Sequence, residues 1–344
     1  MSDSLKIGVL GLTHDHVWGN LDELKETLGA RLVAVADPHL PLLQDAKQKH
    51  GCATYESYQE LVQSQQLDAV WLFSDNATNV ELVEQAASQG LHAMVEKPMA
   101  NNLAGAERMM AAARSHNVRL MINWPFAWWP QLQHAIALAK AGDLGRIWQV
   151  KYRAAHAGPH EMGCSEYFCD WLFDAQRNGA GALIDYCCYG ALVARELLGV
   201  PENVTGVCGR LTKSEISVED NAILLMSYDG ALAISEGSWS QVDNLSSYVT
   251  MIRGTEATLM VEPRSSGRLI RADSKNPDGI EIEVPSPPAH RRSASSHFIH
   301  CIQTGEDFYD FCDQQICRDA QEILEAGLRS ATKGVQVSTP IVSG

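Results

Sequence analysis

The segment Gly90-Leu91-His92-Ala93-Met94-Val95-Glu96-Lys97-Pro98 decides the fold of this chain. The hydrophobic run from Leu91 to Val95 predicts a buried strand, and Pro98 ends it because proline cannot donate a ladder hydrogen bond. Lys97 is therefore expected at the carboxyl end of a strand, where open α/β sheets place the side chains that meet a ligand. A solvated surface lysine is the alternative, and the neighbouring segments decide between the two.

The residues around this strand repeat one pattern of strand and helix. Short apolar runs alternate with apolar residues at helical spacing over the first 123 residues, which predicts parallel strands linked by helices. The expected strands are 7–10, 31–36, 68–74, 91–95 and 118–122, and the expected helices are 17–28, 80–90 and 103–115. The predicted fold class is therefore α/β, with an N-terminal doubly wound parallel sheet of the Rossmann type.

Length and charge limit the possible partners. The chain has 344 residues, more than one ordinary core, so we expect two domains. Its 27 basic and 42 acidic residues give a formal charge of −15, which would repel a nucleic-acid backbone or an anionic membrane. The nine cysteines form no C-x-x-C pair, and we find no signal-like amino terminus and no apolar run of the roughly 20 residues that a membrane span needs. We therefore expect a reduced, cytoplasmic protein with a small-molecule or protein partner.

The turn after the first strand departs from the usual dinucleotide motif. Such a turn carries G-x-G-x-x-G, whose glycines let the backbone approach a pyrophosphate. Here it reads Gly11-Leu12-Thr13-His14-Asp15-His16, so Thr13 and His16 replace the second and third glycines. Asp37 ends the second strand, where an acid accepts hydrogen bonds from an adenosine ribose and would repel a 2′-phosphate. This favours NAD over NADP, and a turn residue before Pro38 is the alternative.

These segments together resemble the glucose-fructose oxidoreductase, inositol dehydrogenase and rhizopine catabolism (Gfo/Idh/MocA) family, over nearly the whole chain. The similar motifs are 7–11, 35–38, 68–70, 90–98, 179–185 followed by Tyr189, 254–259 and a last helix at 320–333. The resemblance implies a nicotinamide-dependent dehydrogenase with an NAD-binding Rossmann domain over residues 1–123. It further implies a substrate-binding α+β domain over residues 124–344, with a large open mixed sheet.

The resemblance also implies that Lys97 and Tyr189 face the reacting carbon, with Asp185 in support. A base must take the hydroxyl proton while the hydride leaves for the nicotinamide. The Lys97 ammonium is expected to lower the pKa of Tyr189 towards that use, and Asp185 would hold a substrate hydroxyl or orient Lys97. The alternatives are a buried tyrosine with a satisfied hydroxyl and an aspartate that caps a helix over 189–198. Cys187 stands where the family usually has glycine.

The expected cofactor contacts are Gly11, Thr13, His14, His16, Asp37, Ser74, Asn76, Asn79, Glu96 and Lys97. Thr13, His14 and His16 would bind the pyrophosphate or ribose by side chain, where other members offer glycine backbone. The segment 74–79 departs from the family pattern, which commonly starts with Thr-Pro and ends with His. The expected cofactor is NAD.

Trp124, His156 and His160 are the expected substrate contacts. Three tryptophans between residues 124 and 129 offer aromatic faces to a sugar, and interdomain core is the alternative. For the two histidines the alternative is a solvated loop. His14, Asp15 and His16 are ligand types that suit zinc, but their spacing matches no closed site, so no metal is expected.

The second half of the chain predicts a mixed sheet. Expected strands are 147–154, 204–211, 222–228, 231–239, 248–253 and 257–261, with a hairpin at Asp229-Gly230. Residues 265–292 are expected to be irregular, and the helices at 296–301 and 320–333 are expected to pack on the dinucleotide domain. A sheet face without helices is commonly buried against another subunit, so a homo-oligomer, dimer or tetramer, is expected.

The sequence therefore predicts an NAD-dependent oxidoreductase that acts on a secondary alcohol of a sugar or polyol. Two alternatives stay open. One is a family member that uses bound NAD transiently around an elimination or glycoside cleavage. The other is a non-catalytic sensing protein that retains the fold.

Overall fold

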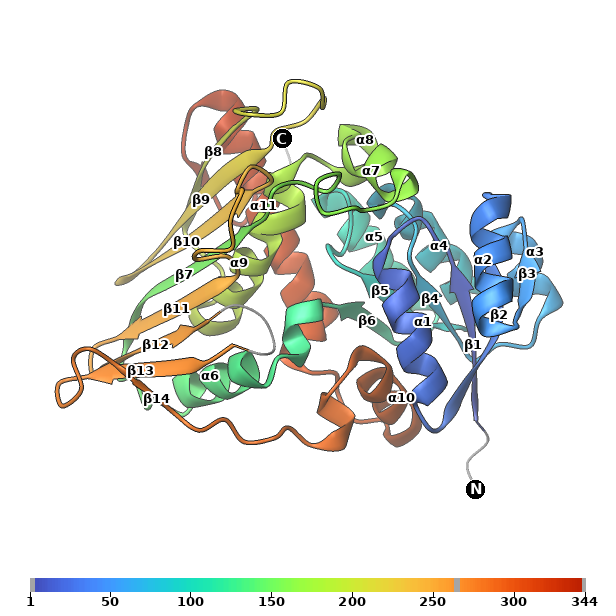
Figure 1. Ribbon diagram of the computed structural model, residues 1–344, viewed down its shortest axis with the longest axis horizontal. Helices are drawn as coiled ribbons and strands as arrows, with labels where there is room; N and C mark the ends of the chain where they lie inside the picture. Colours follow the sequence, from blue (N-terminus) through green and yellow to red (C-terminus); the bar gives the residue numbers. More distant parts are fainter. Residues whose placement is uncertain (1–3, 263–266, 342–344) are drawn as a thin grey trace.

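Two β-sheets lie beside each other in the computed structural model, which describes residues 4–262 and 267–341 (Figure 1). The first sheet has six strands and the second has nine. The long helix α11 (Gln314–Lys333) lies between them and packs against helices of both parts. The α/β class predicted from the sequence is confirmed.

The first sheet is parallel throughout and has the strand order β3-β2-β1-β4-β5-β6. Its elements are β1 (Leu5–Leu10), α1 (His16–Glu26), β2 (Ala30–Ala36), α2 (Leu40–His50), β3 (Ala53–Tyr55), α3 (Tyr58–Ser64), β4 (Ala69–Leu72), α4 (Asn76–Ser88), β5 (His92–Glu96), α5 (Leu103–Ser115) and β6 (Leu120–Asn123). The strand order reverses between β1 and β4, and ligands of doubly wound sheets bind beyond the carboxyl ends of the strands at such a point.

The central strands are hydrophobic because helices cover both faces of the sheet. All four residues of β4 are buried, and so are the last four of β1. Two helix boundaries differ from prediction. α1 ends at Glu26, which leaves Leu28 93% exposed, and α4 starts at Asn76 because the Asp75 carboxylate accepts the Thr78 N–H at 2.8 Å. The elements α2, β3 and α3 were not predicted.

The second sheet is mixed and has the order β14-β13-β12-β11-β7-β10-β9-β8-β15. Its strands are β7 (Ile147–Ala155), β8 (Asn203–Gly209), β9 (Asn221–Tyr228), β10 (Ala231–Ser238), β11 (Val249–Gly254), β12 (Ala257–Val261), β13 (Leu269–Asp273), β14 (Ile280–Glu281) and β15 (Val337–Ser338). β7 and β10 are parallel, and the other neighbouring pairs are antiparallel. The predicted hairpin is present, since Tyr228 pairs with Ala231 and Gly230 has a φ of +72°.

The prediction of an irregular segment over 265–292 is wrong for β13 and β14. β13 pairs with β12 along its whole length and extends the edge of the sheet, which a Pro- and Ser-rich composition does not reveal. Residues 265 and 266 lie outside the described residues.

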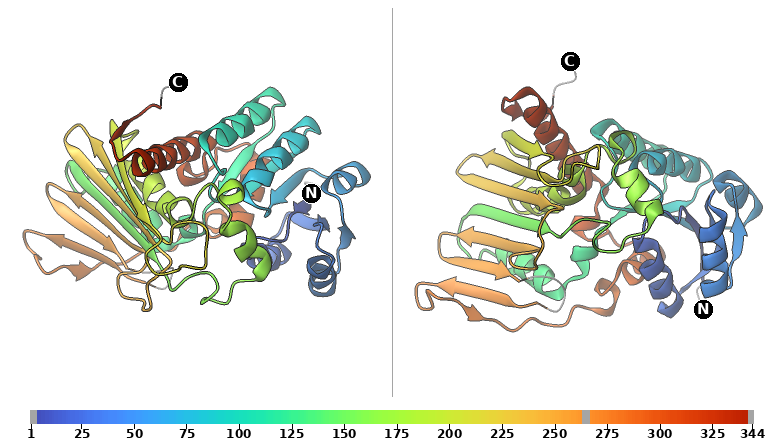
Figure 2. Two further views of the ribbon diagram at one scale, coloured as in Figure 1. Left: turned by 90° about the horizontal axis from the view of Figure 1, so that it is seen from above. Right: turned by 45° about the horizontal axis from the view of Figure 1, so that its top comes forward.

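The remaining helices are η1 (Pro125–Trp128), α6 (Pro130–Lys140), α7 (Glu166–Leu172), α8 (Ala175–Asn178), α9 (Ala182–Leu198), η2 (Ala289–Arg291), α10 (Ala294–Thr304) and η3 (Asp310–Cys312). Helices α6, α9 and α11 lie on the side of the nine-stranded sheet that faces the first sheet, and the other side carries no helix among the described elements (Figure 2). α10 contacts α1, and α11 contacts α9 and α5. In the part of the chain that the structure describes, no helix is both long and apolar enough to cross a membrane.

Candidate active site

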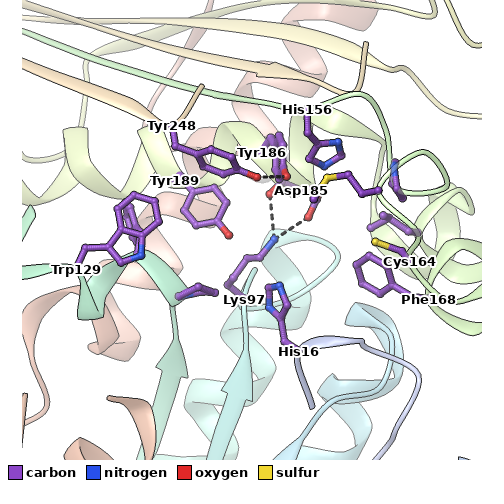
Figure 3. Close-up of a pocket in the computed structure, with 15 residues that line it drawn as sticks. His16, Lys97, Trp129, His156, Cys164, Phe168, Asp185, Tyr186, Tyr189 and Tyr248 are labelled. Carbon is purple, nitrogen blue, oxygen red and sulfur yellow. Dashed lines mark hydrogen bonds and ion pairs between the residues drawn. The ribbon is translucent and has the colours of Figure 1, made fainter. Parts of the chain in front are cut away.

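The centre of the candidate site is a buried ion pair between the two parts of the molecule (Figure 3). Lys97 follows β5, and its Nζ lies 2.7 Å from Asp185 Oδ1 and 3.3 Å from the Asp185 carbonyl oxygen. The second carboxylate oxygen of Asp185 accepts a hydrogen bond from Trp239 Nε1 at 3.1 Å. Burial opposes the charge on Lys97, but the Asp185 carboxylate outweighs it and the pKa of Lys97 is raised. Lys97 is therefore a charged, rigidly held donor.

Asp185 lies inside α9, in its first turn, and the N-cap of α9 is Gly181. The alternative that Asp185 caps a helix over 189–198 is wrong, because α9 starts at Ala182. α9 packs closely on β10: a Cβ on Gly190 would lie 2.2 Å from Ser235 Oγ. Cys187, in place of the usual glycine, is fully buried in the regular helix and its Sγ lies 3.6 Å from the Ser235 carbonyl oxygen. This departure leaves the helix intact.

Tyr189 stands one helical turn after Asp185 and lines the same cavity as Lys97. Lys97 Nζ lies 5.0 Å from the centre of the Tyr189 ring, and the hydroxyl points into the cavity (Figure 3). The expectation that Lys97 lowers the pKa of Tyr189 is wrong. Burial raises the pKa of Tyr189 well above its ordinary value, and the carboxylate of Asp185 offsets the ammonium beside it. Tyr189 therefore stays protonated at neutral pH.

The cavity has a volume of about 330 Å³ and largely aromatic and apolar walls. It is lined by His16, Lys97, Pro125, Phe126, Trp129, His156, Pro159, Met162, Cys164, Phe168, Leu172, Asp185, Tyr186, Tyr189 and Tyr248. The hydroxyls of Tyr186 and Tyr248 lie 2.6 Å apart. Neither tyrosine was predicted: Tyr186 directly follows Asp185 in α9, and Tyr248, just before β11, reaches α9 only through folding.

Of the three predicted substrate contacts, only His156 lines the cavity. Trp124 is 1% exposed, donates its Nε1 to Cys317 Sγ at 3.3 Å and packs edge-on against Tyr189, so it belongs to the core behind the cavity. Trp129 lines the cavity in its place. His156 also lines the cavity, whereas His160 is not among the residues around it and packs near Phe173 at the surface. For Trp124 and His160 the alternatives of core and solvated loop are therefore correct.

His156 is held as a neutral imidazole. Its Nδ1 accepts the Gly158 N–H at 2.8 Å, so the proton lies on Nε2. Burial lowers the pKa of His156 to about 4. The side chain therefore offers the cavity an N–H donor and little basicity.

The turn at residues 11–16, which follows β1, packs against a segment that follows β7 in the second part of the chain. We call residues 157–181, which contain α7 and α8, the cover segment. The Asp15 carboxylate accepts hydrogen bonds from Ser165 N at 2.7 Å and Ser165 Oγ at 2.6 Å. The buried ring of His14 lies 4.7 Å from the Phe168 ring and 5.6 Å from the Trp171 ring. His14 and Asp15, two residues of this turn, thus bind the cover segment.

Two further contacts hold α8 over the carboxyl end of β4. Asn76 Nδ2 donates to Asn178 Oδ1 at 2.8 Å, and Arg177 Nε lies 3.4 Å from Asp75 Oδ2. Ser74 and Asn79 form two hydrogen bonds with each other. Ser74 N donates to Asn79 Oδ1 at 3.2 Å, and Asn79 Nδ2 donates to the Ser74 carbonyl oxygen. The Ser74 N–H, the Asn79 side chain and the Asn76 amide nitrogen are therefore occupied within the protein, whereas Asn76 Oδ1 has no hydrogen-bond partner within the described residues.

Asp37 is fully buried at the end of β2. Its carboxylate accepts Leu12 N at 2.6 Å, His39 N at 2.8 Å and the His39 ring at 2.7 Å. The His39 ring in turn contacts Tyr167 of the cover segment. In this conformation Asp37 does not face open space, which differs from the expectation of a free ribose acceptor.

Glu96 joins the glycine turn to the cavity. Its Oε1 lies 2.9 Å from His16 Nδ1 and its Oε2 accepts Asn123 Nδ2 at 2.7 Å. Ligand atoms of His14, His16 and Glu96 lie within 4.8 Å of one another, a spacing that a metal ion also uses. However, His14 Nδ1 accepts the His16 N–H, which places the His14 proton on Nε2 and leaves no lone pair there for a metal. The direct His16–Glu96 bond accounts for the cluster, and the expectation of no metal stays a prediction.

The residues at this edge fit a dinucleotide in part. Thr13 Oγ1 and Asn76 Oδ1 are buried and have no hydrogen-bond partner within the described part of the chain. The Thr13 hydroxyl can bind a ribose, phosphate or amide group, and the Asn76 oxygen can accept from a ribose hydroxyl or an amide N–H. The cavity around Lys97 gives room for a reacting ring. His39 and Tyr167 of the cover segment lie over Asp37, so its carboxylate is not open to a ribose in this conformation.

The chain thus combines a doubly wound sheet with a second, mixed sheet, and Lys97 lies in a cavity lined by three tyrosines. Residues 5–124 match the model of the oxidoreductase family with an NAD-binding Rossmann fold, and residues 132–260 match the GFO/IDH/MocA C-terminal domain. The chain belongs to the Gfo/Idh/MocA family of oxidoreductases.

Relatives of this chain include sugar dehydrogenases. It is 26% identical over 318 residues to a D-apiose dehydrogenase from Paraburkholderia graminis, across 87% of this chain and 79% of the relative. It is 26% identical over 271 residues to a D-xylose 1-dehydrogenase [NADP(+)] from Haloarcula marismortui, across 77% and 73% of the two chains. Its fold matches an aldose-aldose oxidoreductase from Caulobacter crescentus, complexed with glycerol, with a TM-score of 0.82, 24% identity and coverage of 97% and 99%.

Proposed function

We propose that this protein transfers a hydride between the nicotinamide of NAD and a secondary alcohol or ketone of a sugar, polyol or related cyclic compound. The observation that carries the proposal is the buried Lys97 ammonium, which shares a cavity with the hydroxyl of Tyr189 at the carboxyl end of β5. The sugar dehydrogenases among its relatives support the same substrate class.

In this proposal, Lys97 binds the reacting oxygen and Tyr189 carries its proton. Lys97 donates hydrogen bonds to the carboxylate and the carbonyl oxygen of Asp185. An ammonium has three N–H groups, so Lys97 can also donate to a ligand oxygen. Because Tyr189 stays protonated, it can donate to the alkoxide that develops during reduction. Asp185 keeps Lys97 charged and in place. The nicotinamide, when bound, accepts or returns the hydride.

The proposed cofactor contacts start from Gly11, Thr13 and Asn76, because two of them have unpartnered polar atoms at the sheet edge. His16, Glu96 and Lys97 would lie at the nicotinamide end. Three other predicted contacts would act indirectly, because their contacts within the protein hold the cofactor-binding site in shape: His14, Ser74 and Asn79. Asp37 favours NAD over NADP, since an acid repels a 2′-phosphate. One relative is named as an NADP(+) enzyme, so the affinities of this protein for NAD and NADP should both be measured.

A second candidate is transient use of a retained NAD, in which the substrate is oxidised, altered and reduced again. The cover segment favours it, because the Asp15–Ser165 and Asn76–Asn178 contacts would also slow cofactor exchange. Mass spectrometry of the purified protein decides between them. NAD that copurifies without net NADH formation supports the second candidate, and free exchange with steady NADH formation supports the first.

The function itself is tested by NADH formation with a panel of aldoses and polyols, including D-xylose, D-apiose and myo-inositol. NADH formation by the wild type that is lost in Lys97→Met supports the proposal. A wild type that neither binds NAD in calorimetry nor retains it after purification would overturn it.

We also propose that two copies associate through the uncovered face of the nine-stranded sheet. Outward side chains there include Val207, Ile223, Leu225 and Leu232, which are 67%, 50%, 42% and 44% exposed. A row of exposed apolar side chains on one sheet face commonly marks a subunit contact. Light scattering of the wild type and of Ile223→Lys measures it: a dimer that dissociates in the variant is expected, and a wild-type monomer would refute it.

A further inference from the structure

The cavity holds a second group that can exchange protons, and the proposed reaction needs one. During oxidation the alcohol oxygen must lose its proton as the carbon loses hydride. Tyr189 is 5% exposed and already protonated, so its oxygen can accept that proton only if it passes its own proton on. A further acceptor must therefore connect this buried phenol to solvent.

Three basic side chains line the cavity among the described residues: His16, Lys97 and His156. Lys97 is charged and bound to Asp185, so it has no free lone pair. His156 uses its only acceptor nitrogen for the Gly158 N–H. His16 is the one that remains.

His16 is oriented as proton-transfer histidines are. One ring nitrogen, Nδ1, lies 2.9 Å from Glu96 Oε1, so the carboxylate fixes the ring orientation and leaves Nε2 as the second nitrogen that can exchange a proton. Glu96 is itself fully buried and held by Asn123. The His16 side chain is 42% exposed, and it therefore reaches both the cavity and solvent.

The charged and titratable neighbours of this ring come from three places. Glu96 and Lys97 face it from the end of β5, His14 from its own turn with ring centres 4.6 Å apart, and Cys164 from the cover segment. Burial keeps His14 neutral by lowering its pKa, and the pKa of Cys164 is raised to about 11. Glu96 is thus the one anion among these neighbours.

We propose that His16, positioned by Glu96, is the proton relay of the site. As the substrate carbon passes its hydride, with two electrons, to the oxidised nicotinamide, the alcohol O–H proton moves to Tyr189 oxygen. The Tyr189 proton leaves through the cavity to the free nitrogen of His16 and from there to solvent. In reduction the same path runs in reverse. The inference rests on the proposed function and adds a residue to it.

The test is chemical rescue. His16→Ala should lower kcat for NAD-dependent oxidation at saturating NAD about 100-fold with D-xylose, D-apiose or myo-inositol as the probe. Calorimetry should show NAD binding weakened by only about threefold, because His16 is one of several proposed cofactor contacts. Added imidazole should restore at least about tenfold of this loss, because the truncated side chain opens the cavity to a free base. The restored rate should rise with the fraction of neutral imidazole as pH increases. Glu96→Gln should lower kcat with an unchanged KM, and His116→Ala, an exposed histidine outside the cavity, should change neither.

A rate of His16→Ala that falls at every pH and does not respond to imidazole would overturn the relay while leaving the oxidoreductase function intact. The same holds for a His16→Ala rate equal to that of the wild type. Failure of the proposed function is distinguishable, because the wild type itself would then form no NADH from any of the probes.

Discussion

Replacement of Asp185 by asparagine tests the buried ion pair that organises the site. Asp185 uses both oxygens, one for Lys97 at 2.7 Å and one for Trp239 Nε1 at 3.1 Å. Asparagine has a similar shape but only one oxygen, so one of these two donors must face its amide nitrogen. Lys97 is 2% exposed and would keep a charge without a counter-ion. Loss of one partner from a buried pair costs about 3–5 kcal/mol, so we expect the free energy of unfolding to fall by about 3 kcal/mol.

The pH dependence of this loss has a definite sign. In the wild type the pKa of Lys97 is raised, so its stabilisation is complete below the ordinary lysine pKa of about 10.4 and is lost only as pH rises through the raised value. In Asp185→Asn burial acts without the carboxylate and lowers that pKa. The unfolded chain then binds more protons than the folded one, and the free energy of unfolding rises with pH up to about 10. The difference between the two proteins should therefore shrink from about pH 7 to about pH 10.

Urea unfolding at these two pH values measures the effect. Glu84→Gln is the matched control, because it breaks the exposed Glu84–Arg108 pair and should change stability by less than about 0.5 kcal/mol. A loss below about 1 kcal/mol in Asp185→Asn, with no dependence on pH, would refute the account of a charged and buried Lys97.

Three further predictions concern the tyrosine, the cover segment and the packing of α9. Tyr189→Phe should lower kcat at least about 100-fold with little change in NAD affinity, measured by steady-state kinetics and calorimetry, and undiminished turnover would remove Tyr189 from its role. Asp15→Asn weakens the two bonds to Ser165 by about 1 kcal/mol and should speed NAD association several-fold in stopped-flow fluorescence; an unchanged rate would show that the cover segment does not limit entry. Gly190→Ala brings a Cβ to 2.2 Å from Ser235 Oγ and should cost about 1–3 kcal/mol in urea unfolding, whereas Gly19→Ala, which meets no atom within 4 Å, should cost nothing; equal effects would contradict the packing.

Much of the first sheet could be predicted because its strands are buried on both faces. β4, the last four residues of β1 and the middle of β5 are continuous apolar runs, and segments with helical spacing of apolar residues separate them. α2 and β3 could not be read in this way. α2 is rich in charge, and β3 has three residues with none fully buried. β13 was hidden because only its pairing with β12 makes it a strand.

The part of the candidate site that could be predicted consists of residues in motifs with a recognisable order along the chain. Lys97, Asp185 and Tyr189 occupy motifs whose order identifies the family, and the structure brings them to one cavity. The roles of His14 and Asp15 could not be predicted, since their partners Phe168 and Ser165 lie about 150 residues away. The pKa of Tyr189 was predicted in the wrong direction because Lys97 is only one of the groups that act on the phenol. Burial and the Asp185 charge both act on the phenol as well.

The most direct test of the central claim follows a labelled hydride. A sugar or polyol from the active panel is deuterated at the carbinol carbon and incubated with the protein and NAD, and the nicotinamide is recovered for mass spectrometry. We predict that the recovered NADH carries one deuterium, and that Lys97→Met transfers none. Oxidised substrate with the deuterium lost to water, or label unmoved while product forms, would contradict hydride transfer at the Lys97–Tyr189 cavity.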